Sequence, residues 1–319
     1  MTIKVLIAKD FDHLSEVAAG IVKDNIVKTL KEKDEFVFGL ATGNSPTSMY
    51  RQLAKMSNAG EFDSSRIRSF NLDEYVGLPG ENAQQRTLHP ESYSYFMIQE
   101  FFSLLDKKFI ETSVPWGCLI DQKKLIKELN ANPDDWNELG TDKGKSIVIK
   151  DVAKSEYLAW IRDTVIKAYI KKIENAGGID LHVIGVGGRG HVAFHESGIP
   201  FEGSSVLLVK LDDNTVENAV TDGHFVKKED SPLYAISMGA ELVYKAKTII
   251  LLANGARKKG PIAESLINDP TPDVPISYGQ IFSKKGGNLI YVIDKVAGEE
   301  LLAKKDVLEQ KGIEIEVIN

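Results

Sequence analysis

The sequence FVFGLATGNSPTSMYRQLAKM, residues 36–56, contains an apolar run, a turn and then a periodic apolar pattern. The run at residues 36–42 is of the kind that forms a strand buried on both faces. The apolar residues after the turn are Met49, Leu53 and Met56. Their spacing places them on one helix face, with Ser45 as the expected N-cap and Pro46 at the first helical position. The stretch therefore predicts a strand followed directly by a helix.

The same alternation continues on both sides of this unit. Further strands are expected at residues 67–73, 181–186, 205–211, 248–253 and 289–293. Amphipathic helices are expected at residues 12–30, 91–105 and 151–175. This order favours an α/β fold, a Rossmann-like sheet of mostly parallel strands with helices on both faces in three α/β/α layers. Ligand sites in such folds lie beyond the carboxyl ends of the strands.

One segment, residues 115–150, departs from this rhythm because it is rich in Asn, Asp, Gly and Lys. We expect an insertion there, with one short helix near residues 122–129 and a polar loop. The rest of the chain contains no clear linker, repeat or low-complexity tract. We therefore expect a single domain over residues 1–319 that carries an insertion near 115–150.

The composition excludes several classes of protein. Lys and Arg number 39 and Asp and Glu number 46, a formal net charge of −7, which argues against nucleic-acid binding. No apolar run approaches the roughly 18 residues of a membrane span, and the N-terminal residues lack the pattern of a signal peptide. The one cysteine, Cys118, cannot form an internal disulfide or a cysteine-rich metal site. We expect a cytoplasmic protein with no nucleic-acid or membrane partner.

The loop after the first quoted strand has the residues of a phosphate site. Gly43 lets the backbone approach a ligand, and amides at a helix N-terminus attract anions. Thr42 and Ser45 add hydroxyl donors, and Asn44 lies between them. An ordinary turn with an N-cap explains the same residues, so both interpretations stay open at this point.

Two adjacent carboxylates, Asp73 and Glu74, end the strand expected at residues 67–73. A carboxylate held dry at a strand end can act as a general base. The alternatives are a solvated loop and a cap for the next segment.

The sequence GVGGRGHVAFHE, residues 185–196, places glycines at the end of another strand, followed by His191 and by His195 beside Glu196. A histidine near a carboxylate is an acid–base unit that works near neutral pH. The same stretch matches the dinucleotide pattern G-x-G-x-x-G. That pattern requires a long helix after the third glycine. Glycine and proline interrupt residues 191–204, so a nucleotide site is disfavoured.

These motifs resemble the glucosamine-6-phosphate deaminases (isomerases), a family whose fold is shared with the 6-phosphogluconolactonases. The resemblance is carried by GLATGNSP at residues 39–46, FNLDEYVGLP at 70–79, HPESYSYFM at 89–97 and GVGGRGHVAFHE at 185–196. Of these stretches, FNLDEYVGLP and HPESYSYFM resemble the deaminases rather than the lactonases that share the fold. The resemblance implies isomerisation of an amino-sugar phosphate to a ketose phosphate with loss of ammonia.

The resemblance also implies roles for particular residues. Asp73, with Glu74 beside it, would move a proton between C1 and C2 of the open-chain sugar. His191 would open the sugar ring, and Glu196 would tune that histidine. The residues expected around the phosphate and the sugar are Thr42, Gly43, Asn44, Ser45, Gly187, Arg189 and Lys258. The expected partner is a small phosphorylated sugar, with no metal or organic cofactor, and a homo-oligomer is left open.

Three departures from the family pattern put its usual substrate in question. Arg189 stands where the family usually has an aspartate, His195 stands where it has an asparagine, and residues 218–225 lack an expected arginine. A cation near His191 would disfavour the imidazolium. Arg189 would either pair with Glu196 or hold an altered substrate by a bidentate contact. The alternatives to a deaminase are a lactone hydrolase that uses His191 to activate water and a non-catalytic sugar-phosphate sensor.

Overall fold

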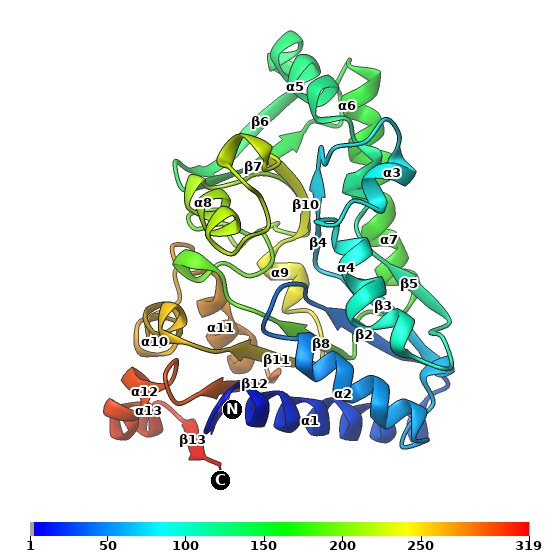
Figure 1. The fold of residues 1–319 in the computed structure, drawn as a ribbon. Helices are drawn as coiled ribbons and strands as arrows, with labels where there is room; N and C mark the ends of the chain where they lie inside the picture. The colour runs from blue at the N-terminus through cyan, green and yellow to red at the C-terminus, as the bar shows by residue number, and fades with distance from the viewer. Residues whose placement is uncertain (1–2, 319) are drawn as a thin grey trace.

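The structure, a computed structural model, describes residues 3–318 and contains an eight-stranded parallel sheet in the order β13-β1-β12-β11-β8-β2-β3-β5 (Figure 1). All neighbouring pairs in this sheet are parallel. The strands are β1 Ile3–Ala8, β2 Phe36–Leu40, β3 Ile67–Asn71, β5 Glu111–Ser113, β8 Leu181–Ile184, β11 Thr248–Ala253, β12 Asn288–Asp294 and β13 Ile313–Val317. The predicted α/β class with a mostly parallel sheet is confirmed.

Helices cover both faces of this sheet. Successive side chains of each strand point to opposite faces, so a strand that is apolar throughout presents an apolar surface on both faces. One face packs against α1 Phe11–Glu32, α2 Thr47–Asn58 and α4 Tyr93–Glu100. The other face packs against α7 Ala168–Asn175, α9 Ala240–Val243, α10 Lys259–Ile267, α11 Tyr278–Lys284, α12 Glu299–Ala303 and α13 Lys305–Gln310. In β1, Leu6 belongs to the first core and Val5 to the second.

A second sheet, which the sequence analysis did not anticipate, packs into the same core as the second face. It is antiparallel, in the order β4-β10-β9-β7-β6. Its strands are β4 Asp73–Val76, β6 Trp136–Thr141, β7 Gly144–Ile149, β9 Val206–Lys210 and β10 Tyr234–Met238. In Figure 1 it lies above the parallel sheet, with α8 Asp213–Thr221 beside it, while α1 and α2 lie below.

This second sheet corrects two of the strand predictions. The strand expected at residues 67–73 is divided, because β3 ends at Asn71 and Asp73 begins β4 in the other sheet. The apolar residues 205–211 form an antiparallel strand of the second sheet rather than a member of the parallel one. Apolar runs reveal buried strands but do not reveal their partners.

Residues 115–150 contain the predicted helix, α5 Gln122–Ala131, but the predicted polar loop is wrong. Strands β6 and β7 pair as a hairpin there and extend the second sheet. The outer strand β6 is exposed over most of its length, so its residues show no apolar alternation. Gly140 and Gly144 flank the turn with φ values of 127° and 135°, which favour glycine.

Several helix boundaries also differ from the predictions. Pro46 occupies the N-cap position of α2, which has no side-chain cap, so Ser45 is not the N-cap. The helix expected at residues 91–105 shortens to α4, and the helix expected at 151–175 begins with α6 Glu156–Trp160 and passes through a π-helical segment, Ile161–Lys167, into α7. A short helix, α3 Ala83–Thr87, precedes α4. No α-helix occupies residues 191–204, which agrees with the case against a dinucleotide site. Within residues 3–318 no helix has the length and apolarity of a bilayer span.

Candidate active site

Four loops meet at the carboxyl ends of β2, β3, β8 and β11, which are consecutive in the order β11-β8-β2-β3. With α8 and the loop after it, they line a cavity of about 710 Å³. Eight predicted site residues line it, namely Thr42, Gly43, Asn44, Ser45, Asp73, Gly187, His191 and Lys258. Glu74, Arg189 and Glu196 are not among the lining residues. The fold therefore brings the predicted phosphate loop and two of the four predicted catalytic residues to one hollow.

Asp73 lies where the chain passes from the parallel sheet to the second sheet, and only 5% of its surface is exposed. Its Oδ1 atom has no hydrogen-bond partner within the described part of the chain. Burial, and then the charge of Glu74, raise the pKa of Asp73 well above its ordinary value. A buried, unpaired carboxylate with a raised pKa is a stronger base than an exposed one.

Glu74 is fully buried and serves a different purpose from its neighbour. Its carboxylate accepts hydrogen bonds from the backbone amides of Tyr93 and Ser94 and from the hydroxyls of Ser92 and Ser94. These groups form the N-terminus of α4, where a negative charge is favourable. The contacts make Glu74 the residue that fixes α4, and with it the cavity-lining Tyr93, beside Asp73.

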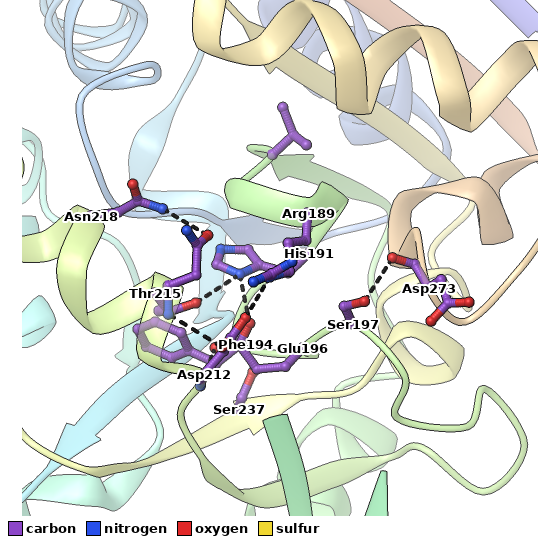
Figure 2. A network of polar contacts seen from close by, with 12 residues as sticks. Arg189, His191, Phe194, Glu196, Ser197, Asp212, Thr215, Asn218, Ser237 and Asp273 are labelled. Carbon is purple, nitrogen blue, oxygen red and sulfur yellow. Dashed lines mark hydrogen bonds and ion pairs between the residues drawn. The ribbon is translucent and has the colours of Figure 1, made fainter. Parts of the chain in front are cut away.

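His191 and Glu196 form the predicted pair, with 2.9 Å between Nδ1 and Oε2 (Figure 2). The hydroxyl oxygen of Thr215, on α8, is 3.4 Å from the same ring nitrogen. The other ring nitrogen, Nε2, lies against Gly187, where a Cβ atom would collide with the ring. Gly187 is therefore required for the imidazole to stand at the cavity wall.

Arg189 does not make the first of the two contacts considered from the sequence, the pair with Glu196. Its Nε donates to Oδ2 of Asp212 at 2.9 Å, so it does not pair with Glu196 (Figure 2). Its side chain is 45% exposed and is not among the residues that line the cavity, so this geometry does not support the second contact, with a substrate. Sequence spacing could not reveal this, because Asp212 comes from a different loop, between β9 and α8.

His195, the other departure, is a buried structural residue. Its Nε2 donates to the carbonyl of Ile199, and its Nδ1 accepts from the amide of Ala240, both at 3.0 Å. Burial lowers its pKa to about 4. A neutral histidine with both nitrogens engaged takes no part in proton transfer.

The positive side of the cavity holds one cation more than predicted. Lys258 donates from Nζ to the carbonyl of Val186 at 2.6 Å, and burial, followed by the charge of Arg257, lowers its pKa. Arg257 also lines the cavity and pairs with Asp222 at 2.7 Å. The sequence does contain a signal for Arg257, because consecutive cations follow the strand, but that signal led only to the prediction of Lys258.

The wall formed by α8 and the loop after it was missed altogether. Its lining residues include Asn214, Thr215, Asn218, Asp222 and His224. His224 is paired with Glu91 at 2.8 Å, between Nδ1 and Oε2. Short polar residues on a partly buried helix such as α8 carry no functional signal in a single sequence. Within residues 3–318, no cluster of three or more His, Cys, Asp or Glu side chains is arranged to hold a metal ion.

Comparison with solved structures places the architecture in a known class. A monomeric glucosamine-6-phosphate deaminase superposes with a TM-score of 0.69 at 24% identity, covering 93% of this chain and all of the other. The 6-phosphogluconolactonase of Trypanosoma cruzi superposes with a TM-score of 0.60 at 19% identity, covering 94% and 97%. The fold is that shared by these two kinds of protein.

Sequence comparison then separates the two branches. The chain is 32% identical to the glucosamine-6-phosphate deaminase of Clostridium acetobutylicum, over 93% of this chain and the whole of that protein. It is 32% identical to the enzyme of the same name from Thermoanaerobacter sp. strain X514, over 96% and 98%. No family model matches the chain. The chain belongs to the glucosamine-6-phosphate deaminase family.

Proposed function

We propose that this chain converts an amino-sugar phosphate to a ketose phosphate with release of ammonia, and that glucosamine 6-phosphate is its substrate. The observation that carries the proposal is Asp73, a buried carboxylate with an unpaired oxygen, in the same cavity as His191, which is paired with Glu196, and two cations. Family membership supports the same activity.

The phosphate would bind between the Thr42–Ser45 loop and Lys258. Thr42 and Ser45 offer hydroxyls, and Gly43 has a φ of 97°, which leaves its backbone open to a ligand. Ser45 donates to Oδ1 of Asn254 at 3.0 Å, which links this loop to the one that carries the lysine. Arg257 beside it supplies the charge that the arginine missing from residues 218–225 would have supplied.

The reaction divides between two groups. His191, held by Glu196, would transfer a proton to the ring oxygen as the C1–O5 bond breaks and receive the proton of the C1 hydroxyl. Asp73 would then remove the proton from C2 and return it to C1, while the amine gives up one proton and the C1 oxygen gains one, so that the C1 aldehyde becomes a hydroxymethyl group and the double bond moves to C2 and its nitrogen. Water adds at C2 and the nitrogen leaves as ammonia, so that sugar phosphate and water give ketose phosphate and ammonia.

Arg189 gives no direct reason to expect an altered substrate, because its guanidinium is paired with Asp212 outside the cavity. The test is incubation with glucosamine 6-phosphate, glucose 6-phosphate and 6-phosphogluconolactone, with ammonia, ketose and acid measured separately. We expect ammonia and ketose in equal amounts from the first substrate alone. Hydrolysis of the lactone would support the lactonase alternative, and binding without any product would support the sensor.

A further inference from the structure

A chain of polar contacts connects the exposed Arg189 to the imidazole of His191 (Figure 2). Arg189 pairs with Oδ2 of Asp212, a side chain that is 6% exposed. The backbone amide of Asp212 donates to Oε1 of Glu196 at 3.3 Å. The other oxygen of Glu196 holds Nδ1 of His191. The arginine thus reaches the ring-opening histidine through two carboxylates.

Asp212 also fixes the start of α8. Its Oδ1 accepts the backbone amide of Asn214 at 3.2 Å, which makes Asp212 the N-cap of that helix. One turn later, Thr215 approaches Nδ1 of His191. The glycine loop packs closely on α8, because a Cβ atom at Gly188 would collide with Asn214 and Asn218. The start of α8 therefore positions Thr215 beside the imidazole directly, and Glu196 through the backbone amide of Asp212.

The backbone of Arg189 has an unfavourable conformation, which the surrounding contacts must maintain. Its φ is 53°, in the left-handed region, which is unfavourable for a residue that carries a side chain. Strain of this kind persists where surrounding contacts enforce it. Arg189 lies two residues before His191 in the chain, and the contact that holds its side chain is the pair with Asp212.

We propose that Arg189 and Asp212 are a positioning pair, which fixes Glu196 and α8 so that His191 is aligned for ring opening. Neither residue lines the cavity. The inference rests on the proposed function, since ring opening is the step that it serves. It assigns to Arg189 neither the binding role nor the inhibitory role expected from the sequence.

Arg189→Gln and Asp212→Asn separate this role from a structural one. Asparagine still caps a helix and keeps the backbone amide that contacts Glu196, so Asp212→Asn removes only the ion pair. We expect each variant to lower kcat by about 10- to 100-fold, the scale of a small misplacement of a catalytic group. The double variant should be no slower than the slower single variant, because both remove one interaction.

Binding is measured with the open-chain alcohol of the substrate, 2-amino-2-deoxyglucitol 6-phosphate, which needs no ring opening. Its dissociation constant should change less than twofold in all three variants. The matched control is Arg51→Gln, which breaks the pair of Arg51 with Glu100 between α2 and α4 and should leave kcat unchanged. Unchanged kcat in either single variant, additive losses in the double variant, or weaker binding in proportion to kcat would each overturn the proposal.

A spectroscopic readout keeps the inference separate from the proposed function. In nitrogen-15 spectra of the histidine side chains, the His191 signals are identified by their loss in His191→Gln. They should move in Arg189→Gln and Asp212→Asn and stay in place in Arg51→Gln. Absence of ammonia from the wild-type protein, with these signals moving, would overturn the proposed function and not the positioning. Signals that stay in place would overturn the positioning.

Discussion

Asp73 is buried and has an oxygen without a hydrogen-bond partner, and we expect the activity of the protein to depend on the charge of this carboxylate. Replacing it with Asn keeps the shape and removes the base. We expect kcat to fall by roughly 10²–10⁴-fold, the contribution of one positioned acid–base group, while the dissociation constant of the open-chain alcohol stays within twofold. A rate above about a tenth of the wild-type value in steady-state assays would show that Asp73 is not the base.

The same substitution should stabilise the protein at neutral pH. The folded state raises the pKa of Asp73 above its ordinary 3.8, so the folded chain binds that proton more tightly than the unfolded chain does. Stability is therefore lost as pH rises from about 3.8 through the raised value, and it is not regained above it. Asp73→Asn should gain about 1–3 kcal/mol in the free energy of unfolding there. Urea titrations at neutral pH and near pH 4 test this, because the gain should shrink at the lower pH.

In the proposed function, Lys258 would contribute a point charge to phosphate binding in both the ground state and the transition state. Lys258→Met keeps most of the apolar stem, and it should raise KM by about 10- to 100-fold with a smaller change in kcat. Because burial lowers the pKa of this lysine, phosphate binding should also weaken at a less alkaline pH than an exposed lysine would give. Competition by inorganic phosphate across the alkaline range measures both effects, and an unchanged KM would remove Lys258 from the site.

The site residues that were predicted from the sequence share one property: a pattern in the neighbouring residues indicates each of them. Thr42 and Ser45 follow a strand and precede a helix, and His191 follows a glycine run, so the position of each is set by nearby residues. The orientation of Glu74 and of Arg189 depends instead on partners 18 to 23 residues away in the chain. No local pattern could assign those partners.

At the scale of elements, the β6–β7 hairpin supports the site from a segment that was expected to be a polar loop. Gly144 begins β7 with a φ of 135°, and a Cβ atom there would collide with Cβ of Glu196. Gly144→Ala should displace Glu196 and lower kcat by roughly tenfold or more. Lys143→Ala, one residue earlier and exposed, is the control. Equal kinetics for the two variants would contradict the contact.

The parallel sheet was easier to predict than the antiparallel one for a physical reason. Parallel strands buried on both faces read as continuous apolar runs, as in β11, which is buried at every position. Strand β6 is mostly exposed, and β4 has only four residues, two of them acidic, that are buried by tertiary contacts rather than by apolar character. Their sequences carried no strand signal.

At the scale of the whole molecule, the cavity is built from both sheets and from α8, so a ligand that fills it connects parts of the chain that are far apart. A ligand at a hundredfold excess over its dissociation constant adds about 2.7 kcal/mol to folding stability. The open-chain alcohol, 2-amino-2-deoxyglucitol 6-phosphate, which is not turned over, should therefore raise the melting temperature by about 4 °C at that excess. Thermal unfolding of the wild-type protein and of Lys258→Met, each with and without the ligand, tests this. An equal rise in melting temperature for both proteins would place the ligand elsewhere.

The order of the strands also has a consequence for synthesis. Strand β1 lies between β12 and β13, its two neighbours in the sheet, so Ile3 pairs with Leu289 and Ile313, which are translated long after it. The apolar side chains of β1, including Val5 and Ile7, cannot be covered by these neighbours until both strands have been translated. An unpaired strand of this kind invites association with other chains. The nascent protein should therefore need protection by a chaperone until β12 and β13 have emerged, and the sheet should close only then.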